Sequence, residues 1–214
     1  MPTGVAISDP REQLFAAAER ILLRDGPQAL TSRAVTTEAG CAKGVLHRHF
    51  ADFDDFLAGL VRDRIARLGP RADALLQAAG TGTVTGNLTA ELTDLFGSVA
   101  VAVVALITFR DDLRARLRKT TPAGVPLLTE AAAMLAAYLA AERDLGRVTW
   151  DADVATLAPT LLGAGHLLFA GRDTTPAPAT VHRTVATVMA SVVQEPRLTG
   201  DRDTGQAMDT LGDR

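Results

Sequence analysis

Apolar residues recur every three or four positions along most of this 214-residue chain, which is the spacing of one face of an α-helix. The first such stretch opens with Asp-Pro-Arg-Glu at residues 9–12, where Asp suits a helix cap and Pro suits the first helical position. Leu14, Ala18 and Ile21 then share one face, and a Gly-Pro pair ends the pattern. We predict a helix over residues 10–25.

Two short helical stretches follow, over residues 32–39 and 43–50, with a sharp turn between them. Gly40 allows this turn because glycine tolerates a positive φ without a steric penalty. In the second stretch Leu46 and Phe50 stand four residues apart, so both point inward. This arrangement is typical of a helix-turn-helix.

The outer edge of the second stretch carries Lys43 and His47, also four residues apart, with Arg48 close by. A short helix that offers cationic and hydrogen-bonding side chains along one edge fits the DNA major groove. The pattern therefore predicts a DNA-reading helix.

This segment resembles the signature of the tetracycline-repressor-like (TetR) family of bacterial one-component regulators, roughly T-x-x-x-[IV]-A-x-x-A-G-V-S-x-G-x-L-Y-x-H-F-x-x-K. The specific matches are Ala-Gly at residues 39–40, Gly44, Leu46 and His-Phe at residues 49–50. The resemblance covers about the first 65 residues by motif, and the remainder only by length and helical character.

Four residues depart from the family signature. Ala42 replaces a capping Ser, whose side chain typically contributes about 1 kcal/mol to a helix. His47 replaces a Tyr that meets the DNA backbone in relatives, Phe53 replaces a phosphate-facing Lys, and Cys41 replaces a core Val. These departures concern phosphate anchoring and not the fold.

The family motif implies a set of DNA contacts on both short helices. For His47 and His49 the alternative is a role as ordinary surface histidines. By match to the motif, Arg33 should contact DNA from the first short helix, Lys43, Gly44 and Val45 should approach base edges, and His47, Arg48 and His49 should meet bases or phosphates.

We predict four parts along the chain. Residues 1–52 form the helix-turn-helix DNA-binding domain, and a connector helix over residues 53–68 ends at the Gly-Pro pair 69–70. The charged residues of this connector are interpreted as an ordinary solvated face. Residues 69–194 form an effector-binding and dimerisation domain, and the polar residues 195–214 form a disordered tail.

The predicted fold class is all-α: an N-terminal three-helix helix-turn-helix DNA-binding domain followed by a larger helical ligand-binding and dimerisation domain. Alternating strand patterns bounded by turn dipeptides are absent from the sequence. The longest apolar run, residues 99–109, is shorter than the roughly 18 residues needed to span a bilayer. After a Gly/Thr-rich loop over residues 80–86, the predicted C-terminal helices are 87–109, 111–119, 126–144, 151–171 and 178–194.

Two apolar stripes on the last two helices predict a homodimer. Paired with the same helices of a second copy, they would form a four-helix interface. A dimer would also supply two DNA-binding domains for one operator. The alternative is that both stripes pack inside their own domain. The predicted interface residues are Leu157, Leu161, Gly165, Leu168, Val181, Val185, Val188 and Val192.

A second group of C-terminal residues mixes bulk, polarity and irregular spacing, which suggests a largely apolar pocket for a small hydrophobic effector. The alternative for each residue is a place in the core, although buried Tyr, Trp and His also need polar partners. The predicted ligand-binding residues are Phe96, Val99, Val103, Leu106, Phe109, Met134, Tyr138, Trp150, His166 and Phe169.

Composition narrows the function classes. A net charge of −3 argues against nonspecific coating of nucleic acid, so any DNA contact must be local. The single Cys41 excludes an internal disulfide, and no apolar run follows residues 1–9, so we expect a cytoplasmic protein without a signal peptide. The histidines lack metal-ligand spacing and no nucleophile or phosphate-loop motif occurs, so we expect no catalytic residue, metal or cofactor.

The sequence therefore predicts a repressor that binds palindromic double-stranded operator DNA as a homodimer and is released by a small hydrophobic effector. The alternative is a helical ligand- or partner-binding protein that has lost operator recognition. Ala42, Phe53 and the missing basic surplus favour that alternative. An enzyme is the least favoured class.

Overall fold

The computed structural model describes residues 9–120, 124–170 and 175–194. In these ranges the regular structure is helical, apart from one isolated β-bridge between Val148 and Val193. The predicted all-α fold is confirmed. The helices are α1 (Pro10–Asp25), a 3-10 turn (Pro27–Ala29), α2 (Ser32–Glu38), α3 (Gly44–His49), α4 (Phe53–Ala66), α5 (Leu68–Gln77), α6 (Val84–Phe96), α7 (Ala100–Phe109), α8 (Asp111–Leu117), α9 (Leu128–Asp144), α10 (Val154–Ala170) and α11 (Pro178–Met189).

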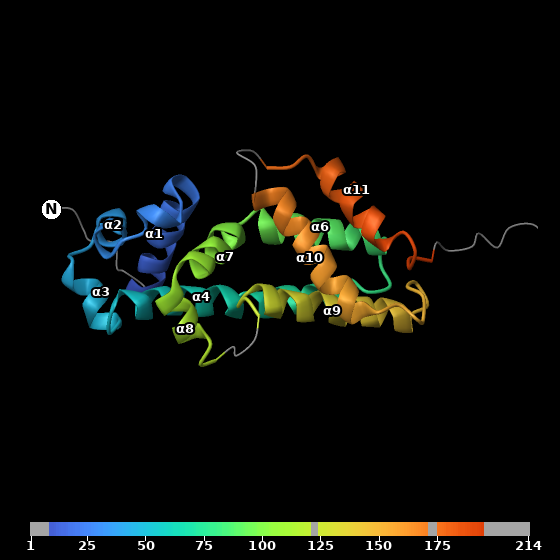
Figure 1. The fold of residues 1–214 in the computed structure, drawn as a ribbon, viewed down its shortest axis with the longest axis horizontal. Helices are drawn as coiled ribbons and strands as arrows, with labels where there is room; N and C mark the ends of the chain where they lie inside the picture. The colour runs from blue at the N-terminus through green and yellow to red at the C-terminus, as the bar shows by residue number, and fades with distance from the viewer. Residues whose placement is uncertain (1–8, 121–123, 171–174, 195–214) are drawn as a thin grey trace, which may run out of the picture.

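The molecule is elongated, with α1, α2 and α3 gathered at one end (Figure 1). We call these three helices the head. α4 leads from the head along the length of the molecule, and α7 and α8 lie between the head and the remaining helices (Figure 1). α6, α9, α10 and α11 form the other end, where α6 packs on α10 and α11, and α9 packs on α5 and α10.

Helix caps in the head follow the sequence signals. α1 has the predicted bounds, and its Asp9 carboxylate accepts a hydrogen bond from the Arg11 backbone N–H at 2.8 Å. Thr31 caps α2 by accepting from the Ala34 N–H at 3.1 Å. Gly40 has φ +65°, as the sharp turn between α2 and α3 requires.

An aromatic cluster joins the head to α4. The rings of Phe15, Phe50 and Phe56 lie with centroids 5.2 to 5.7 Å apart, and Phe53 stacks on Phe56 at 5.6 Å. Gly59 of α4 faces this cluster, because a Cβ there would lie 3.0 Å from Phe50 and 3.2 Å from Phe15. The close approach of α4 to the head therefore depends on a glycine at this position.

The connector is longer than the predicted helix over residues 53–68. α4 ends at Ala66, and a further helix, α5, begins at Leu68. The sequence pattern did not predict this second helix. The Gly-Pro pair 69–70 was interpreted as a helix end, but it lies in the first turn of α5. Proline is tolerated there because first-turn N–H groups have no intrahelical partner.

The predicted helix over residues 87–109 is in fact two helices, α6 and α7, bent by 57° at the break. The Ser98 hydroxyl donates to the Leu95 carbonyl at 2.5 Å and accepts from the Ala100 N–H at 3.3 Å. These bonds compete with the helical ladder and account for the break. Among the described residues, no single helix has the length and apolar character to cross a membrane; the bent pair of α6 and α7 meets that test only when the two are combined.

The remaining helices match their predictions to within about three residues, except that α11 ends at Met189 and not at residue 194. α6 begins at Val84, inside the predicted loop, because Thr83 caps it by accepting from the Gly86 N–H at 3.0 Å. α10 begins after Asp153, whose carboxylate accepts from the Thr156 N–H at 3.2 Å. Residue 171, predicted to end this helix, and the predicted tail over residues 195–214 lie outside the described residues.

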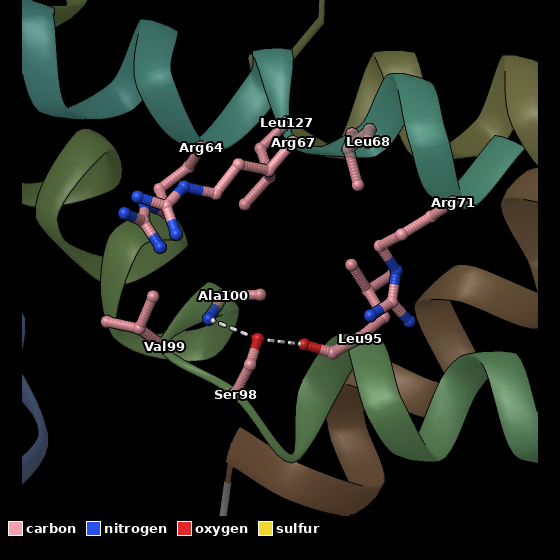
Figure 2. Close-up of a pocket in the computed structure, with 9 residues that line it drawn as sticks. All are labelled: Arg64, Arg67, Leu68, Arg71, Leu95, Ser98, Val99, Ala100 and Leu127. Atoms are coloured by element: carbon pink, nitrogen blue, oxygen red, sulfur yellow. Dashed lines mark hydrogen bonds between the residues drawn. The ribbon is translucent and has the colours of Figure 1, made fainter.

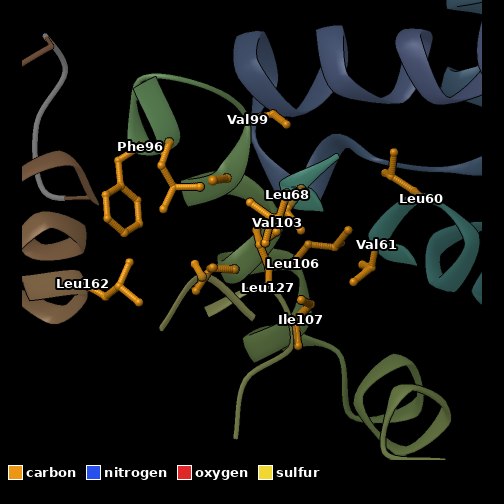
Figure 3. Packing of buried hydrophobic residues seen from close by; sticks show 14 of the residues in the cluster. Leu60, Val61, Leu68, Phe96, Val99, Val103, Leu106, Ile107, Leu127 and Leu162 are labelled. Atoms are coloured by element: carbon orange, nitrogen blue, oxygen red, sulfur yellow. The ribbon is translucent and has the colours of Figure 1, made fainter. Parts of the chain in front are cut away.

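One apolar core runs through the molecule from the head to the far end. Figure 3 shows α4 residues meeting α7 residues beside the start of α9, with α6 and α10 closing the other side. The core thus places α4, α5, α6 and α7 around a common centre, which positions the cavity described below. The labelled members are Leu60, Val61, Leu68, Phe96, Val99, Val103, Leu106, Ile107, Leu127 and Leu162.

Candidate nucleic-acid interface and effector cavity

The head presents one exposed edge that contains most of the predicted DNA-binding residues. Arg33 of α2, Lys43 before α3, and Gly44, His47 and Arg48 of α3 are exposed. Val45 and His49 are half-buried. Leu46 and Phe50 point the opposite way into the core, with 0% and 4% exposure. The inward and outward sides of α3 are therefore those that the sequence indicated.

Polar contacts between α1 and α2 hold this edge in place. The Gln13 side-chain amide donates to the Ala39 carbonyl at 3.0 Å, at the end of α2. Arg20 and Arg24 of α1 pair with Glu38 at 2.8 and 3.2 Å, and their hydrogen bonds lower the pKa of its carboxyl group. These contacts fix the angle at which α2 leads into α3.

Ala42 leaves the start of α3 without a side-chain cap. Lys43 occupies the capping position and its side chain makes no capping hydrogen bond. The first turn depends instead on a backbone bond from the Val45 N–H to the Ala42 carbonyl at 2.9 Å. The departure noted in the sequence therefore removes a cap without preventing the helix.

Phe53 stands where the family signature has a Lys that faces phosphate. Its ring packs in the aromatic cluster and does not extend into solvent as that Lys would. The guanidinium carbon of Arg110, just after α7, lies 5.5 Å from the centre of the Phe53 ring. Arg110 also lies 3.5 Å from an Asp54 carboxylate oxygen and donates to the Leu30 carbonyl at 3.3 Å. Arg110 thus joins the end of α7 to the head.

A second arginine makes a similar connection from α8. Arg116 lies 2.8 Å from Asp52 and 3.6 Å from Asp55, at the start of α4. A hydrogen bond from the Asp55 backbone N–H, together with Arg116, lowers the pKa of the Asp52 carboxyl group. The acidic residues that follow the DNA-reading helix are therefore paired with cations from the rest of the molecule.

Two predicted ligand-binding residues lie on the surface, which corrects their assignment. Phe109 is 73% exposed and Trp150 is 85% exposed. Phe109 is the last residue of α7, and the chain turns into α8 directly after it, so its ring has no neighbouring helix to cover it. Trp150 lies in the turn between α9 and α10. Neither side chain lines the cavity described below.

The structure brings three other predicted ligand residues together. The Phe96 ring of α6 lies 5.8 Å from the His166 ring and 6.0 Å from the Phe169 ring of α10, measured between centroids. Burial lowers the pKa of His166. Of the ten predicted ligand-binding residues, only Val99 lines the cavity described below. The members of the set that are buried in the core are Phe96, Val99, Val103, Leu106, Met134, Tyr138 and Phe169.

Tyr138 belongs to a buried polar network that joins α9 to the α5–α6 connection. Its hydroxyl donates to Glu142 at 2.6 Å and accepts from the Asn87 side-chain amide at 3.0 Å. Glu142, which is fully buried, also accepts from the Gly80 N–H at 3.3 Å and lies 3.5 Å from Arg147. Burial and the Glu142 carboxylate raise the pKa of Tyr138 well above its ordinary value. These partners satisfy the hydroxyl inside the fold.

Tyr138→Phe should therefore destabilise the protein by about 1–3 kcal/mol, because the Oε1 atom of the fully buried Glu142 loses the hydrogen bond that Tyr138 donates to it, and Asn87 loses one of its acceptors. Urea unfolding followed by circular dichroism measures this difference in the free energy of unfolding. Operator affinity of the folded variant should be unchanged. An unaltered unfolding midpoint would show that the network contributes nothing and would return Tyr138 to the list of candidate ligand contacts.

A cavity of about 160 Å³ lies between the connector and the α6–α7 break (Figure 2). Three arginines line it, and two of them, Arg64 and Arg67, were interpreted from the sequence as part of a solvated face. The signal that could have identified them is their helical spacing, at positions 64, 67 and 71. The lining residues are Arg64, Arg67, Leu68, Arg71, Leu95, Ser98, Val99, Ala100 and Leu127.

Half of the predicted dimer-interface residues are buried within the protomer, which corrects their assignment. Leu161, Val181 and Val185 are each 1% exposed, because α10 packs on α9 and α11 packs on α6. Gly165 faces Phe96, where an added Cβ would lie 2.8 Å from the ring. These four residues contribute to the fold of one chain.

The opposite face of α10 is exposed and mainly apolar or small. Leu167, in the last turn of α10, is 77% exposed. The other predicted interface residues are half-buried: Leu157 and Leu168 on α10, Val188 on α11, and Val192 in the turn after α11. We call the following set the α10 face: Ala155, Thr156, Pro159, Thr160, Gly163, Leu167 and Ala170.

In the parts of the chain that the structure describes, no group of three or more His, Cys, Asp or Glu side chains is placed to hold a metal ion. Cys41, the single cysteine, is half-buried in the turn before α3.

Comparisons with known proteins agree with this geometry. Residues 14–59, which include α1 to α3 and the start of α4, match the family described as "Bacterial regulatory proteins, tetR family". Regulators of this family are generally non-enzymatic DNA-binding proteins that also bind small-molecule effectors and act as dimers. No curated protein sequence matches the chain.

Solved structures of such regulators share the fold across nearly their whole length. Reduced NemR of E. coli is 18% identical with a TM-score of 0.69, over 86% of this chain and 98% of NemR. FadR of Bacillus subtilis, solved with stearoyl-CoA, is 16% identical with a TM-score of 0.64, over 84% and 97%. SmeT, the repressor of the Stenotrophomonas maltophilia multidrug efflux pump SmeDEF, is 18% identical with a TM-score of 0.60, over 88% and 92%. Residues 14–59 thus carry the DNA-binding domain of the tetR family of bacterial regulators, and the chain as a whole shares the fold of solved regulators of that family.

Proposed function

We propose that this protein is a repressor that binds a palindromic operator as a homodimer and leaves it when a small effector binds. The observation that supports this most directly is the exposed edge of α3, where Lys43, His47 and Arg48 stand outward from a buried aromatic core. Such an edge on the second helix of a helix-turn-helix can enter the major groove, with its first residues nearest the base edges. Arg33 of α2 is exposed for a flanking contact.

Dimerisation is supported by the α10 face. A palindromic operator presents two half-sites about 34 Å apart, so one protein must supply two heads related by a two-fold axis. An exposed leucine on a helix face of small residues lets a second copy approach closely. The corrected proposal moves the interface from the buried stripes to Leu167 and its neighbours on this face.

The repressor role and effector release are supported by likeness to the solved structures. SmeT is a repressor and FadR was solved with stearoyl-CoA, and both share the fold of this chain. We extend these two properties to the present protein as part of the proposal. The domain boundaries at residues 52 and 69 remain part of it too.

A structural change caused by effector binding can be transmitted to the head through α7 and α4. α7 begins at the cavity, where Ala100 forms part of the lining, and ends at Arg110, which contacts Leu30 and Asp54. α4 carries Arg64 at the cavity and Asp52 at its cap, next to α3. A ligand that shifts α7 against α4 would therefore change the position of the head relative to the rest of the protomer. For release, the ligand must bind the DNA-incompetent arrangement more tightly.

A second candidate is a helical ligand- or partner-binding protein that no longer recognises an operator. Phe53 favours it, because a packed aromatic ring replaces the phosphate-facing Lys of the family signature. The net charge of −3 also gives no general attraction for DNA. Operator recognition is favoured over this candidate because the α3 edge keeps its exposed cations.

Selection of bound sequences from a random DNA pool tests the proposal. We expect an inverted repeat with half-sites one helical turn apart or a multiple of it, because the two heads of a dimer are symmetric. Its affinity, followed by gel shift, should fall steeply as salt rises from 50 to 200 mM, as phosphate contacts require. Enrichment of no sequence at all, with weak binding to every duplex, would favour the second candidate.

A further inference from the structure

We propose that the cavity between α4–α5 and α6–α7 binds a small carboxylate with an apolar body, whose negative end is held by Arg64, Arg67 and Arg71. This inference rests on the proposed function in so far as it names the ligand that regulates the protein. As a binding site it stands on the geometry of the cavity alone. It also changes the predicted effector class from a purely hydrophobic molecule to an amphipathic anion.

The three arginines share one face of the connector even though α4 and α5 are separate helices. Their spacing of three and then four residues places the side chains in one row toward the α6–α7 break. Figure 2 shows Arg64 and Arg67 on one side of the cavity and Arg71 on the other, with Ser98 and Ala100 across from them. An anion in the cavity would therefore meet guanidinium groups from two sides.

Each arginine is oriented by a carboxylate that lies outside the lining. Arg64 is 2.6 Å from Glu19, Arg67 is 3.1 Å from Asp63, and Arg71 is 2.8 Å from Glu91. Asp63 also lies 2.8 Å from Arg64, which therefore has two carboxylate partners. A guanidinium has five N–H donors, so these partners leave donors on each arginine for a ligand.

The charge that a ligand meets in the cavity is positive. None of the described lining residues is acidic, because Glu19, Asp63 and Glu91 are not part of the lining. Burial raises the pKa of Glu19 and of Glu91, and the neighbouring arginines oppose this rise. Bidentate pairing of arginine with a carboxylate supplies both affinity and orientation.

The rest of the lining sets the size and character of the ligand. Leu68, Leu95, Val99 and Leu127 are buried apolar side chains. The cavity volume of about 160 Å³ is comparable to that of a protein cavity that holds one benzene molecule. A molecule with one aromatic ring or a short alkyl chain, ending in a carboxylate, fits both the volume and the charges.

Leu127 gives an independent indication that this site is functional. It has φ 76° and ψ −50°, and it is the single non-glycine residue with positive φ in the described part of the chain. Glu130 accepts a hydrogen bond from its N–H at 2.7 Å and holds it in this conformation. Backbone strain of this kind concentrates at ligand sites, where the surrounding structure maintains it.

Calorimetric titration of the full chain with benzoate and with benzamide tests the inference. Benzoate should bind at least about tenfold more tightly than benzamide, because only the anion pairs with the guanidinium groups. Arg67→Gln should weaken benzoate binding about tenfold or more. Arg62→Gln is the matched control: Arg62 lies on α4 shortly before Arg67, with similar exposure and one ion pair, to Asp55, but does not line the cavity.

Circular dichroism of both variants establishes that they are folded. Arg67→Lys keeps the charge and should restore part of the affinity, which a purely structural role of Arg67 would not produce. Equal binding of benzoate and benzamide, absence of benzoate binding, or equal losses in Arg67→Gln and Arg62→Gln would each overturn the inference. Operator binding measured on the same samples separates the two proposals: DNA binding without benzoate binding removes only this inference, whereas benzoate binding without any operator removes only the proposed repressor.

Discussion

Leu167→Asp should convert the protein into a folded monomer that has lost most of its affinity for the operator. Leu167 is 77% exposed on the α10 face, so the substitution should not disturb the protomer. In a dimer it would bury a carboxylate in an apolar interface, which costs several kcal/mol without a partner. A single head then binds without its tethered copy, and operator affinity should fall on the order of 10²- to 10⁴-fold.

Light scattering measures the mass of the variant, and gel shift measures its operator affinity. Leu145→Asp is the control, because Leu145 is also an exposed leucine, at 57%, but lies just past the end of α9. That variant should remain a dimer. A dimeric Leu167→Asp protein would place the interface elsewhere.

Val185→Asp should have a different outcome, although the sequence pattern placed Val185 in the interface. The residue is 1% exposed within its own protomer, where α11 packs on α6. A carboxylate there would unfold the chain and not dissociate a dimer. Loss of helical signal in Val185→Asp, together with its retention in Leu167→Asp, would distinguish core residues from interface residues.

The contrast between these two residues shows what helical periodicity can and cannot predict. A stripe of valines on α11 correctly indicated a buried face. The sequence could not determine whether that face was covered by the same chain or by a second copy, since both coverings require the same apolar residues. The exposed face of α10 consists mainly of small residues and Thr, so no apolar stripe in the sequence indicated it as an interface.

Helix boundaries were predictable where the signal is local. Asp9 and Thr31 cap their helices through hydrogen bonds to residues two and three positions away, and Gly40 turns the chain by its own φ. The α6–α7 break was missed because it depends on Ser98 bonding to backbone groups of an otherwise uninterrupted apolar run. The start of α5 was missed because its Gly-Pro pair is compatible with both an end and a beginning.

The two candidate functional sites also differed in whether the sequence could predict them. The edge of α3 was predictable because its inward and outward sides follow from spacing on a single helix. The cavity was not, because three elements far apart in sequence form it: the connector, the α6–α7 break and the start of α9. Bulky aromatic residues such as Phe109 and Trp150 were chosen for their chemistry, but their exposure depends on which helix lies beside them.

Lys43→Ala should weaken operator binding by about 1–3 kcal/mol, roughly 5- to 150-fold, and relax the sequence preference at one position of each half-site. Lys43 is exposed at the start of α3, and the first residues of a recognition helix approach the base edges. Gel shifts with the selected operator and with its single-position variants measure affinity and preference together.

Lys119→Ala is the charge-matched control, because Lys43 and Lys119 are the two lysines of the sequence and Lys119 is exposed beyond α8. It should bind the operator like the unaltered protein. Uniformly weaker binding of Lys43→Ala to every sequence, with a salt dependence reduced by about one counterion, would make Lys43 a phosphate contact. Equal losses in both variants would mean that net charge alone is responsible, and α3 would then not be the element that reads the operator.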